Sequence, residues 1–411
     1  MAKDKKATTP KPAKINLWVY HVYIPVLTFI ARIRYGLKID KSKIKDKKGP
    51  FLVLGNHTTP IDFLFFSGCI YPKPLNYVVA SNMYYATFYR IYLNRFNTIP
   101  KKQFSTDFNC IKLIKRFLDN DISVLLFPEG RVTVDGTTGY INPSIGRLVK
   151  WLGYPVVCGL TKGGYVSNPK WGRHKRSGKI SLGLEQILSR DDIAGMSAAE
   201  ISDMILGKLR YNDNQTLIDN GYRVAGYRIA EGLERVLYKC PKCGAEFKNR
   251  TKWKKMTCLA CGNTVIYQNS GTIVPAGETD VGFRLINEWY KYERDCIAQE
   301  VEKEDFSISD KVIFLMNNAK LKKFTPVGEG AVSVSREGIV YRGGMNGEEK
   351  TLTFKIQNHA SLAFKMGDNF EVSEEENIYR FQFKEGLYST KYVLAIEEIY
   401  KRYYWNEKSA D

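Results

Sequence analysis

A histidine and an aspartate five positions apart, His57 and Asp62, are the residues of this chain best suited to acid–base chemistry. They lie in LVLGNHTTPIDFLFF, residues 52–66, where an apolar run typical of a strand ends at Gly55 and a helix is expected near Pro60. An imidazole titrates near neutral pH, with a pKa of about 6.5, so it is a natural general base. A carboxylate one helical turn further on is placed to accept a hydrogen bond from its other nitrogen, which would fix the tautomer.

Local structure alone explains part of this pattern. Thr59 as N-cap, Pro60 as first helical residue and Asp62 as third would form a capping box without any catalysis. It does not explain His57, which precedes the cap at the carboxyl end of a strand, where ligand crevices form in α/β sheets. A nucleophile motif such as GxSxG does not accompany the histidine. We therefore expect the base to act on a hydroxyl group of the substrate.

A second signal lies about seventy residues later, in LLFPEGRVTVDGTTG, residues 125–139. An apolar strand ends there in Phe-Pro-Glu-Gly-Arg, and the proline and glycine fix a turn that is expected to aim Glu129 and Arg131 outward. The planar fork of an arginine suits a phosphate monoester. A Pro-Glu-Gly turn is common by itself, but two such signals at two strand ends are far more specific.

Together the two stretches resemble the glycerolipid acyltransferases, the 1-acylglycerol-3-phosphate O-acyltransferase family. The hallmark Asn-His-x4-Asp appears as residues 56–62 and the hallmark Phe-Pro-Glu-Gly as residues 127–130. Two weaker blocks, RFNTIPKK at 95–102 and GYPVVCGL at 153–160, lie where the family has them. The resemblance covers roughly residues 15–215. The sequence departs from the family pattern in two places. Arg131 follows the glycine directly, whereas one residue usually separates the two, and a lysine replaces the usual arginine of the second block. Both departures affect residues that the resemblance assigns to the headgroup of the acceptor.

The resemblance implies acyl transfer from a thioester, acyl-CoA or acyl carrier protein, to the free hydroxyl of a lysophospholipid. The simplest such reaction converts 1-acylglycerol 3-phosphate to phosphatidate. His57 would be the general base and Asp62 the carboxylate that orients it, with no metal needed. The residues expected to bind substrate are Asn56, Lys101, Lys102, Glu129, Gly130 and Arg131. The alternative is a structural histidine in an unrelated α/β domain.

Four of the eight cysteines form a tight group that predicts a metal site. The pairs Cys240 and Cys243, then Cys258 and Cys261, have the spacing of a zinc ribbon with a structural Zn²⁺, and the alternative is a redox pair. A module this small usually needs its metal to fold. The loop between the pairs is basic and contains Trp253. It could therefore bind protein, nucleic acid or lipid headgroups, or the zinc ribbon could have a purely structural role. The remaining cysteines are scattered, which favours a reducing compartment.

The N-terminal stretch INLWVYHVYIPVLTFIARIR, residues 15–34, is apolar and flanked by positive charge. Residues 1–50 carry thirteen Lys and Arg against three Asp, about half of the net charge of +19. The apolar part is about seventeen residues, short of the ~20 that a spanning helix needs. We expect a peripheral or monotopic anchor on an anionic bilayer at the cytoplasmic face. A buried helix and a true span are the alternatives.

The order of expected elements divides the chain. Alternating strands and helices from residue 51 predict an α/β sandwich of the acyltransferase type, and short strands dominate after residue 310. The strand order at the C-terminus loosely resembles a pleckstrin-homology (PH) or GRAM-like module. The expected parts are an anchoring segment at 1–50, the acyltransferase domain at 51–215, a connector at 216–235, the zinc ribbon at 236–270 and a β-rich domain with a terminal helix at 271–411.

Two functions of different classes fit these features. The first is a membrane-associated acyltransferase whose partners are the bilayer, the lysophospholipid and the acyl thioester, with no nucleic acid expected. The second is a zinc-ribbon adaptor that binds anionic lipid or nucleic acid and carries a non-catalytic acyltransferase half. The presence of His57, Asp62 and Glu129 together favours the enzyme.

Overall fold

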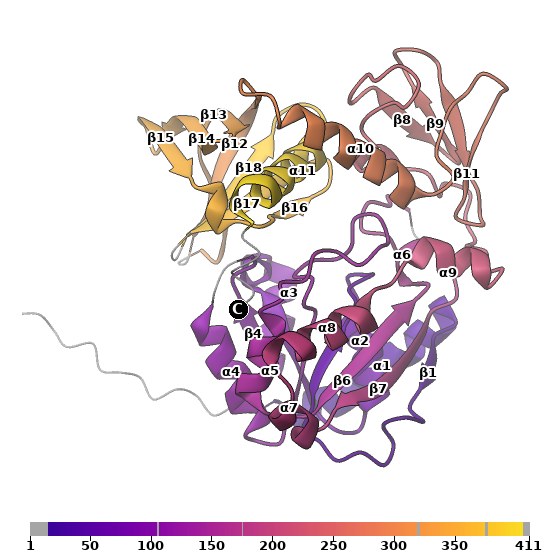
Figure 1. Cartoon of the computed structure of the whole chain (residues 1–411), viewed down its shortest axis with the longest axis vertical. Coiled ribbons are helices and arrows are strands. Elements are labelled where there is room, and N and C mark those ends of the chain that lie inside the picture. The colour runs from indigo at the N-terminus through magenta and orange to yellow at the C-terminus, as the bar shows by residue number, and fades with distance from the viewer. Residues whose placement is uncertain (1–14, 105–106, 175, 319–320, 375–376, 406–411) are drawn as a thin grey trace, which may run out of the picture.

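Three β-sheets organise the chain into an α/β body and, above it, a β-rich part (Figure 1). The computed structural model describes residues 15–104, 107–174, 176–318, 321–374 and 377–405. The lysine-rich residues 1–14, on which part of the expected anchoring rests, lie outside the described residues.

The sheet of the α/β body has the strand order β1-β7-β6-β2-β5-β3-β4. All neighbouring pairs are parallel except β6 with β7, which confirms a mixed α/β fold. Its central strands β2 and β5 are buried throughout, as expected for parallel strands covered on both faces. The strands are β1 (Lys38–Asp40), β2 (Leu52–Gly55), β3 (Leu75–Ala80), β4 (Ile99–Lys101), β5 (Ser123–Leu126), β6 (Val156–Lys162) and β7 (Ser181–Leu188).

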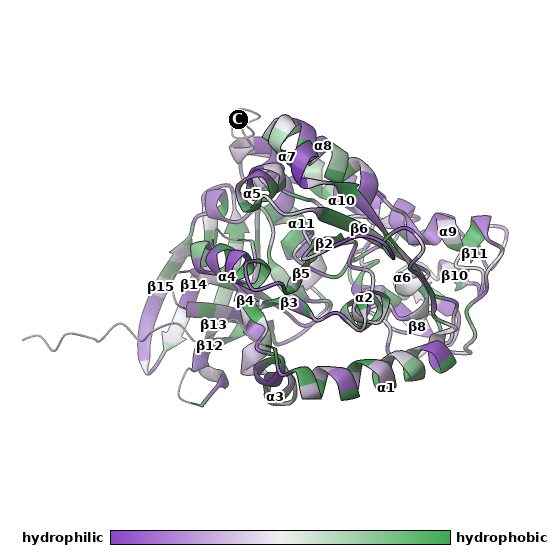
Figure 2. Ribbon diagram, turned by 90° about the horizontal axis from the view of Figure 1, so that it is seen from below, coloured by the Kyte–Doolittle hydropathy of each residue, from purple (hydrophilic) through white to green (hydrophobic). Residues whose placement is uncertain are grey.

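Helices cover both faces of this sheet. Figure 2 shows α1 along one side of the α/β body and α5, α7 and α8 on the opposite side, with β2 and β6 between them. The helical segments are α1 (Leu17–Tyr35), α2 (Asp62–Ile70), η1 (Ser81–Tyr85), α3 (Thr87–Phe96), α4 (Phe108–Leu118), α5 (Ile145–Leu152), α6 (Gly164–Ser167), α7 (Arg190–Gly195), α8 (Ala198–Leu209), α9 (Asp213–Asp219) and η2 (Leu233–Arg235).

The first helix, α1, has one face on the protein and one face exposed. Asn16, which interrupts the apolar run in the sequence, is the N-cap and accepts a hydrogen bond from the N–H of Val19. Tyr20 and Ile24 are buried against the α/β body, whereas Ile33 on the other face is 71% exposed. Among the described residues, none of the helices combines the length and apolar character needed to cross a bilayer.

A small antiparallel sheet in the order β11-β10-β9-β8 carries the four cysteines. The helix α10 (Ile286–Glu300) runs from it towards the third sheet (Figure 1). We did not anticipate α10 from the sequence, although its buried residues Ile286, Trp289, Tyr290, Glu293 and Ile297 recur at helical spacing. The strands are β8 (Asn249–Lys252), β9 (Lys255–Cys258), β10 (Thr264–Tyr267) and β11 (Ile273–Pro275).

The third sheet is antiparallel, in the order β15-β14-β13-β12-β18-β17-β16, and the helix α11 packs against it. This confirms a β-rich C-terminal region, whereas its likeness to PH or GRAM modules stays a prediction. The elements are β12 (Ser307–Asn318), β13 (Lys323–Ser335), β14 (Gly338–Met345), β15 (Glu348–Phe354), η3 (Ile356–Asn358), β16 (Ala363–Lys365), β17 (Asn369–Glu374), β18 (Asn377–Phe383), α11 (Ser389–Ile399) and η4 (Tyr400–Tyr404).

Candidate active site and candidate metal centre

His57 lies on the turn between β2 and α2, with its imidazole held on two sides. The ring nitrogen Nδ1 is 3.0 Å from Oδ2 of Asp62. The ring also stacks on Phe127, with centroids 4.2 Å apart and planes 9° from parallel. The side chain is 19% exposed and lines a large cavity. The two sequence motifs therefore meet at one ring, which is fixed in orientation while part of it stays accessible.

Asp62 is buried and accepts hydrogen bonds from the turn that holds His57. Its carboxylate takes the N–H of Thr58 at 2.6 Å and the N–H of Thr59 at 3.0 Å, besides the imidazole. Burial raises the pKa of this carboxyl above its ordinary value, and the hydrogen bonds from His57 and the two N–H groups oppose that rise. Only one of the two hydrogen bonds of the expected capping box forms, the one from the N–H of Thr59 to the Asp62 carboxylate. The Thr59 hydroxyl does not accept the N–H of Asp62, because it faces the N–H of Ile61 at 3.4 Å. The helix begins near Pro60 as expected, but its N-cap is Ile61 and its first residue is Asp62, not Thr59 and Pro60.

Glu129 is buried behind the histidine. Its Oε1 accepts the backbone N–H of His57 at 2.9 Å and its Oε2 the N–H of Gly139 at 2.7 Å. Burial raises the pKa of this carboxyl to about 7. Gly130, next in the turn, has a φ of +71°, a conformation that favours glycine. The contacts of Glu129 are those of a residue that positions His57, and its contact with substrate stays a prediction.

Asn56 belongs to the predicted substrate site, but it is not among the residues that line the cavity. Its amide nitrogen donates to the carbonyl of Thr161 at 3.0 Å, and its amide oxygen accepts the N–H of Thr161 at 2.7 Å. Both ends of the buried side chain are thus used to join the turn after β2 to β6. The outward orientation that substrate binding requires is not observed, because the amide pairs with a neighbouring strand.

The two lysines of the second block differ in position. Lys101, at the end of β4, lines the cavity, and its Nζ donates to the carbonyl of Lys102 at 3.3 Å. The backbone N–H of Lys102 is bound by Asp107 at 3.0 Å, and Lys102 is not among the residues that line the cavity. Lys101 is therefore the better placed of the two for a ligand.

Arg131 lines the cavity but its guanidinium is already engaged by the C-terminal region. Nη2 lies 2.6 Å from Oε1 of Glu397 in α11, and Nη1 donates to the hydroxyl of Ser361 at 2.7 Å. The guanidinium also lies over the ring of Phe364, 5.3 Å from its centroid. The sequence predicts that the guanidinium of Arg131 points outward, and the structure differs. The guanidinium is bound by Glu397 and Ser361, which lie more than 200 residues later in the sequence.

The cavity in front of His57 has a volume of ≈ 2510 Å³. This is larger than the roughly 300–1,000 Å³ of ordinary small-molecule pockets. Its lining comes from α1, α3, α4 and α5 of the α/β body and from β16, β17 and β18 of the third sheet. The C-terminal region therefore forms one wall of the space that contains the histidine.

Residues 36–159 match the acyltransferase family model. This acyltransferase segment contains both the His57–Asp62 pair and the Pro-Glu-Gly turn, so it supports an acyltransferase activity in lipid synthesis. One similar solved structure is the 1-acyl-sn-glycerophosphate (LPA) acyltransferase PlsC from Thermotoga maritima, at 16% identity over 46% of this chain and 75% of that chain, with a TM-score of 0.39. A superposition this loose carries no argument about function. The search of curated proteins gives no match.

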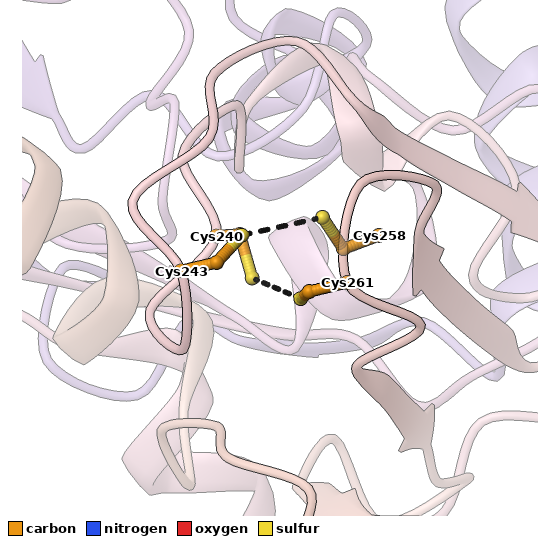
Figure 3. A group of neighbouring side chains, drawn as sticks. All are labelled: Cys240, Cys243, Cys258 and Cys261. Carbon is orange, nitrogen blue, oxygen red and sulfur yellow. Dashed lines mark hydrogen bonds between the residues drawn. The ribbon is translucent and has the colours of Figure 1, made fainter.

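Beyond the acyltransferase segment, the four cysteines form a compact group (Figure 3). All four sulfur atoms lie within 4.8 Å of one another, with Cys240 and Cys261 3.8 Å apart and Cys243 and Cys258 3.9 Å apart. Four sulfurs at ~2.3 Å around a tetrahedral zinc ion would be about 3.8 Å apart. The spacing of the thiols therefore fits one such ion.

Proposed function

We propose that this protein transfers a fatty acyl group from a thioester donor, acyl-CoA or acyl carrier protein, to the free hydroxyl of a lysophospholipid. The simplest acceptor is 1-acylglycerol 3-phosphate and the product is phosphatidate. One observation carries the proposal: the His57 ring is held at Nδ1 by buried Asp62 while its accessible part faces the cavity. The family match of residues 36–159 agrees with this chemistry.

In the proposed reaction His57 accepts the proton of the acceptor hydroxyl at Nε2. The oxygen attacks the thioester carbonyl, the carbon–sulfur bond breaks, and the leaving thiolate takes the proton from the imidazolium. Asp62 keeps the Nδ1–H tautomer and stabilises the imidazolium. General base catalysis of this kind contributes roughly 10²–10⁴-fold. The remaining acceleration comes from positioning the two substrates and stabilising the oxyanion.

The test is acyl transfer by His57→Ala, with His174→Ala as a matched control. His174 also pairs with a carboxylate, Glu231, at 2.9 Å, but it does not line the large cavity. We expect His57→Ala to lose transfer by about 10²–10⁴-fold while its thermal unfolding stays close to that of the wild type. The control should keep full activity. Transfer retained by His57→Ala would refute the base assignment, whereas an absence of transfer by the wild type itself would favour the adaptor with a non-catalytic acyltransferase half.

We also propose that α1 lies on an anionic bilayer, as a peripheral or monotopic anchor at the cytoplasmic face. Its exposed face carries large apolar side chains, among them Trp18, Phe29 and Ile33. Arg32 and Arg34 in its last turn suit anionic headgroups. Tyr23 and other α1 residues line the cavity. A lysophospholipid would thus enter from the bilayer side towards His57.

For the cysteine centre we propose a structural Zn²⁺ held by Cys240, Cys243, Cys258 and Cys261. The sulfur spacing and the all-thiolate set support this ion. Two glycines with positive φ, Gly244 and Gly262, end the two knuckles, and each donates its N–H to the carbonyl of the first cysteine of its pair at 2.9 Å. The ion would fix the two knuckles relative to each other and takes no part in acyl transfer.

A further inference from the structure

Lys170 is a cation of the cavity that belongs to none of the sequence motifs. It lies in the loop after α6, and it lines the same cavity as His57 and Arg131. Its Nζ donates to the carbonyl of Phe364, 194 residues later in the third sheet, at 3.1 Å. The ammonium is surrounded by protein, yet the residue is exposed and is among those that line the cavity. A ligand in the cavity can therefore reach it.

The charges around Arg131 are balanced without Lys170. Arg131 pairs with Glu397, and Arg294 pairs with both Glu397 and Glu398, each at 2.6 Å. Two arginines thus meet two glutamates, and their charges cancel.

Near Lys170, the carboxylate of Glu371 is likewise bound to Arg380, at 2.6 Å. For Lys170 itself, no ion pair is found within the part of the chain that the structure describes. Burial and, after it, the nearby charge of Arg131 lower the pKa of Lys170 to about 8, while the charge of Glu371 opposes this shift. The ammonium group therefore has a positive neighbour, and the carboxylate near it, that of Glu371, is already paired with Arg380, so an anion binds favourably there.

We propose that Lys170 binds the phosphate monoester of a substrate, beside Arg131 and next to Phe364 in strand β16 of the third sheet. This rests on the proposed function, since a glycerophosphate acceptor must bring its phosphate close to His57. Arg131 is two residues from Glu129, which holds the backbone of His57, so the cationic pair lies near the base. Lysine is a well-suited point charge for phosphate. A phosphate monoester also occurs in the nucleotide of coenzyme A, so the test must separate the acceptor from the donor.

The experiment compares full-length wild type with Lys170→Met, Lys170→Arg and the control Lys162→Met, an exposed lysine at the end of β6 outside the cavity lining. Acyl-CoA is the donor, and the acceptors are 1-acylglycerol 3-phosphate and a monoacylglycerol without phosphate. We expect Lys170→Met to raise KM for the phosphorylated acceptor about 10- to 100-fold, the effect of one hydrogen bond to a charged group. The value of kcat, the KM of acyl-CoA and the kinetics with monoacylglycerol should stay the same. Lys170→Arg should restore most of the affinity.

A rise in KM for acyl-CoA that disappears with acyl-pantetheine would instead assign the site to the donor's phosphate. Equal kinetics of Lys170→Met and wild type with all substrates would overturn the proposal. If the wild type transfers no acyl group to any acceptor, the proposed function fails. Binding of inorganic phosphate then still tests whether Lys170 binds a phosphate group. In that measurement millimolar phosphate should raise the Tm of wild type and of Lys162→Met but not of Lys170→Met. Equal shifts in all three would overturn the phosphate site itself.

Discussion

Arg131, in the turn of the acyltransferase motif, forms a 2.6 Å ion pair with Glu397, 266 residues later in the chain. The same carboxylate binds Arg294 at 2.6 Å. These two arginines, together with the Ser361 hydroxyl, lower the pKa of Glu397 to about 2, although burial opposes the shift. The pair joins the turn next to His57 to α11, so the geometry of the candidate active site depends on the C-terminal region.

The first prediction concerns this pair at low pH. Because the pKa of Glu397 is lower in the folded protein than the usual 4.5, its stabilising effect is present above about pH 4.5 and is lost as the pH falls towards 2. The wild type should lose roughly 3 kcal/mol of unfolding free energy through this group over that window. Glu397→Gln should lack this slope and be less stable at pH 7 by about 3–5 kcal/mol, since Arg131 loses its carboxylate partner and Arg294 keeps only Glu398.

Urea unfolding at a series of pH values between 5 and 2 measures this effect. The control is Glu278→Gln, an exposed glutamate whose replacement should leave both the slope and the stability unchanged. The same pH slope in Glu397→Gln as in wild type would show that another group controls the acid sensitivity.

The second prediction concerns Asp62→Asn. The imidazole and the N–H groups of Thr58 and Thr59 all bind the same oxygen, Oδ2, so an amide oxygen in that place keeps these hydrogen bonds but removes the negative charge that stabilises the imidazolium. We expect kcat to fall by about 10²–10⁴-fold with a KM close to that of the wild type. The pH–rate profile should also shift, because the imidazolium loses its carboxylate. Asp203→Asn on the exposed side of α8 is the control, and a normal pH profile in Asp62→Asn would rule out the orienting role.

The third prediction separates positioning from substrate binding at Glu129. If Glu129 only holds the backbone of His57, Glu129→Ala should lower kcat by about 10–100-fold and leave KM for the acceptor unchanged. Glu129→Gln, which keeps an acceptor for one of the two N–H groups, should show a smaller loss. A rise in acceptor KM as the main effect would instead assign Glu129 to the substrate.

The fourth prediction is that the purified protein contains one zinc ion per chain, measured by atomic emission. Cys258→Ser should lose the ion and unfold the small sheet β8–β11, because such a module has little core without its metal. Cys296→Ser, outside the cysteine group, should keep the zinc. Full zinc content in Cys258→Ser would exclude the proposed ligand set.

The fifth prediction concerns the exposed face of α1. A double substitution Phe29→Glu and Ile33→Glu should abolish sedimentation with vesicles that contain anionic lipid, because it replaces apolar side chains that would enter the bilayer with negative charge. Val281→Glu, an equally drastic change at an exposed apolar residue elsewhere, is the control. Unchanged vesicle binding of the double variant would place the membrane contact on another surface.

Features that depend on short-range patterns could be predicted from the sequence. The strand expected to end at Gly55 does end there, and the four cysteines were identified by their spacing alone. His57 and Asp62 were paired because a turn and one helical step bring them together. The mixed α/β body and the β-rich C-terminal region followed from the alternation and length of the apolar runs.

Contacts between distant parts of the chain could not be predicted in this way. Asn56 was predicted to bind substrate because no partner for its amide is visible nearby in the sequence. Its partner, Thr161, is 105 residues away and is brought close by strand pairing. Arg131 looked free for the same reason, and Lys170 carried no motif at all. Helix α10 is a different case, since its helical spacing was present but its many charged residues concealed the buried stripe.

The distance in sequence between Arg131 and Glu397 has a consequence for protein synthesis. Ribosomes add about 5–20 residues per second, so Glu397 is made roughly 13–50 s after Arg131. During this interval the nascent acyltransferase segment has its motifs in place while the far wall of the cavity does not yet exist. Its apolar lining is then open to the surroundings, so newly made chains need shielding, by a chaperone or by the bilayer, until translation has reached α11.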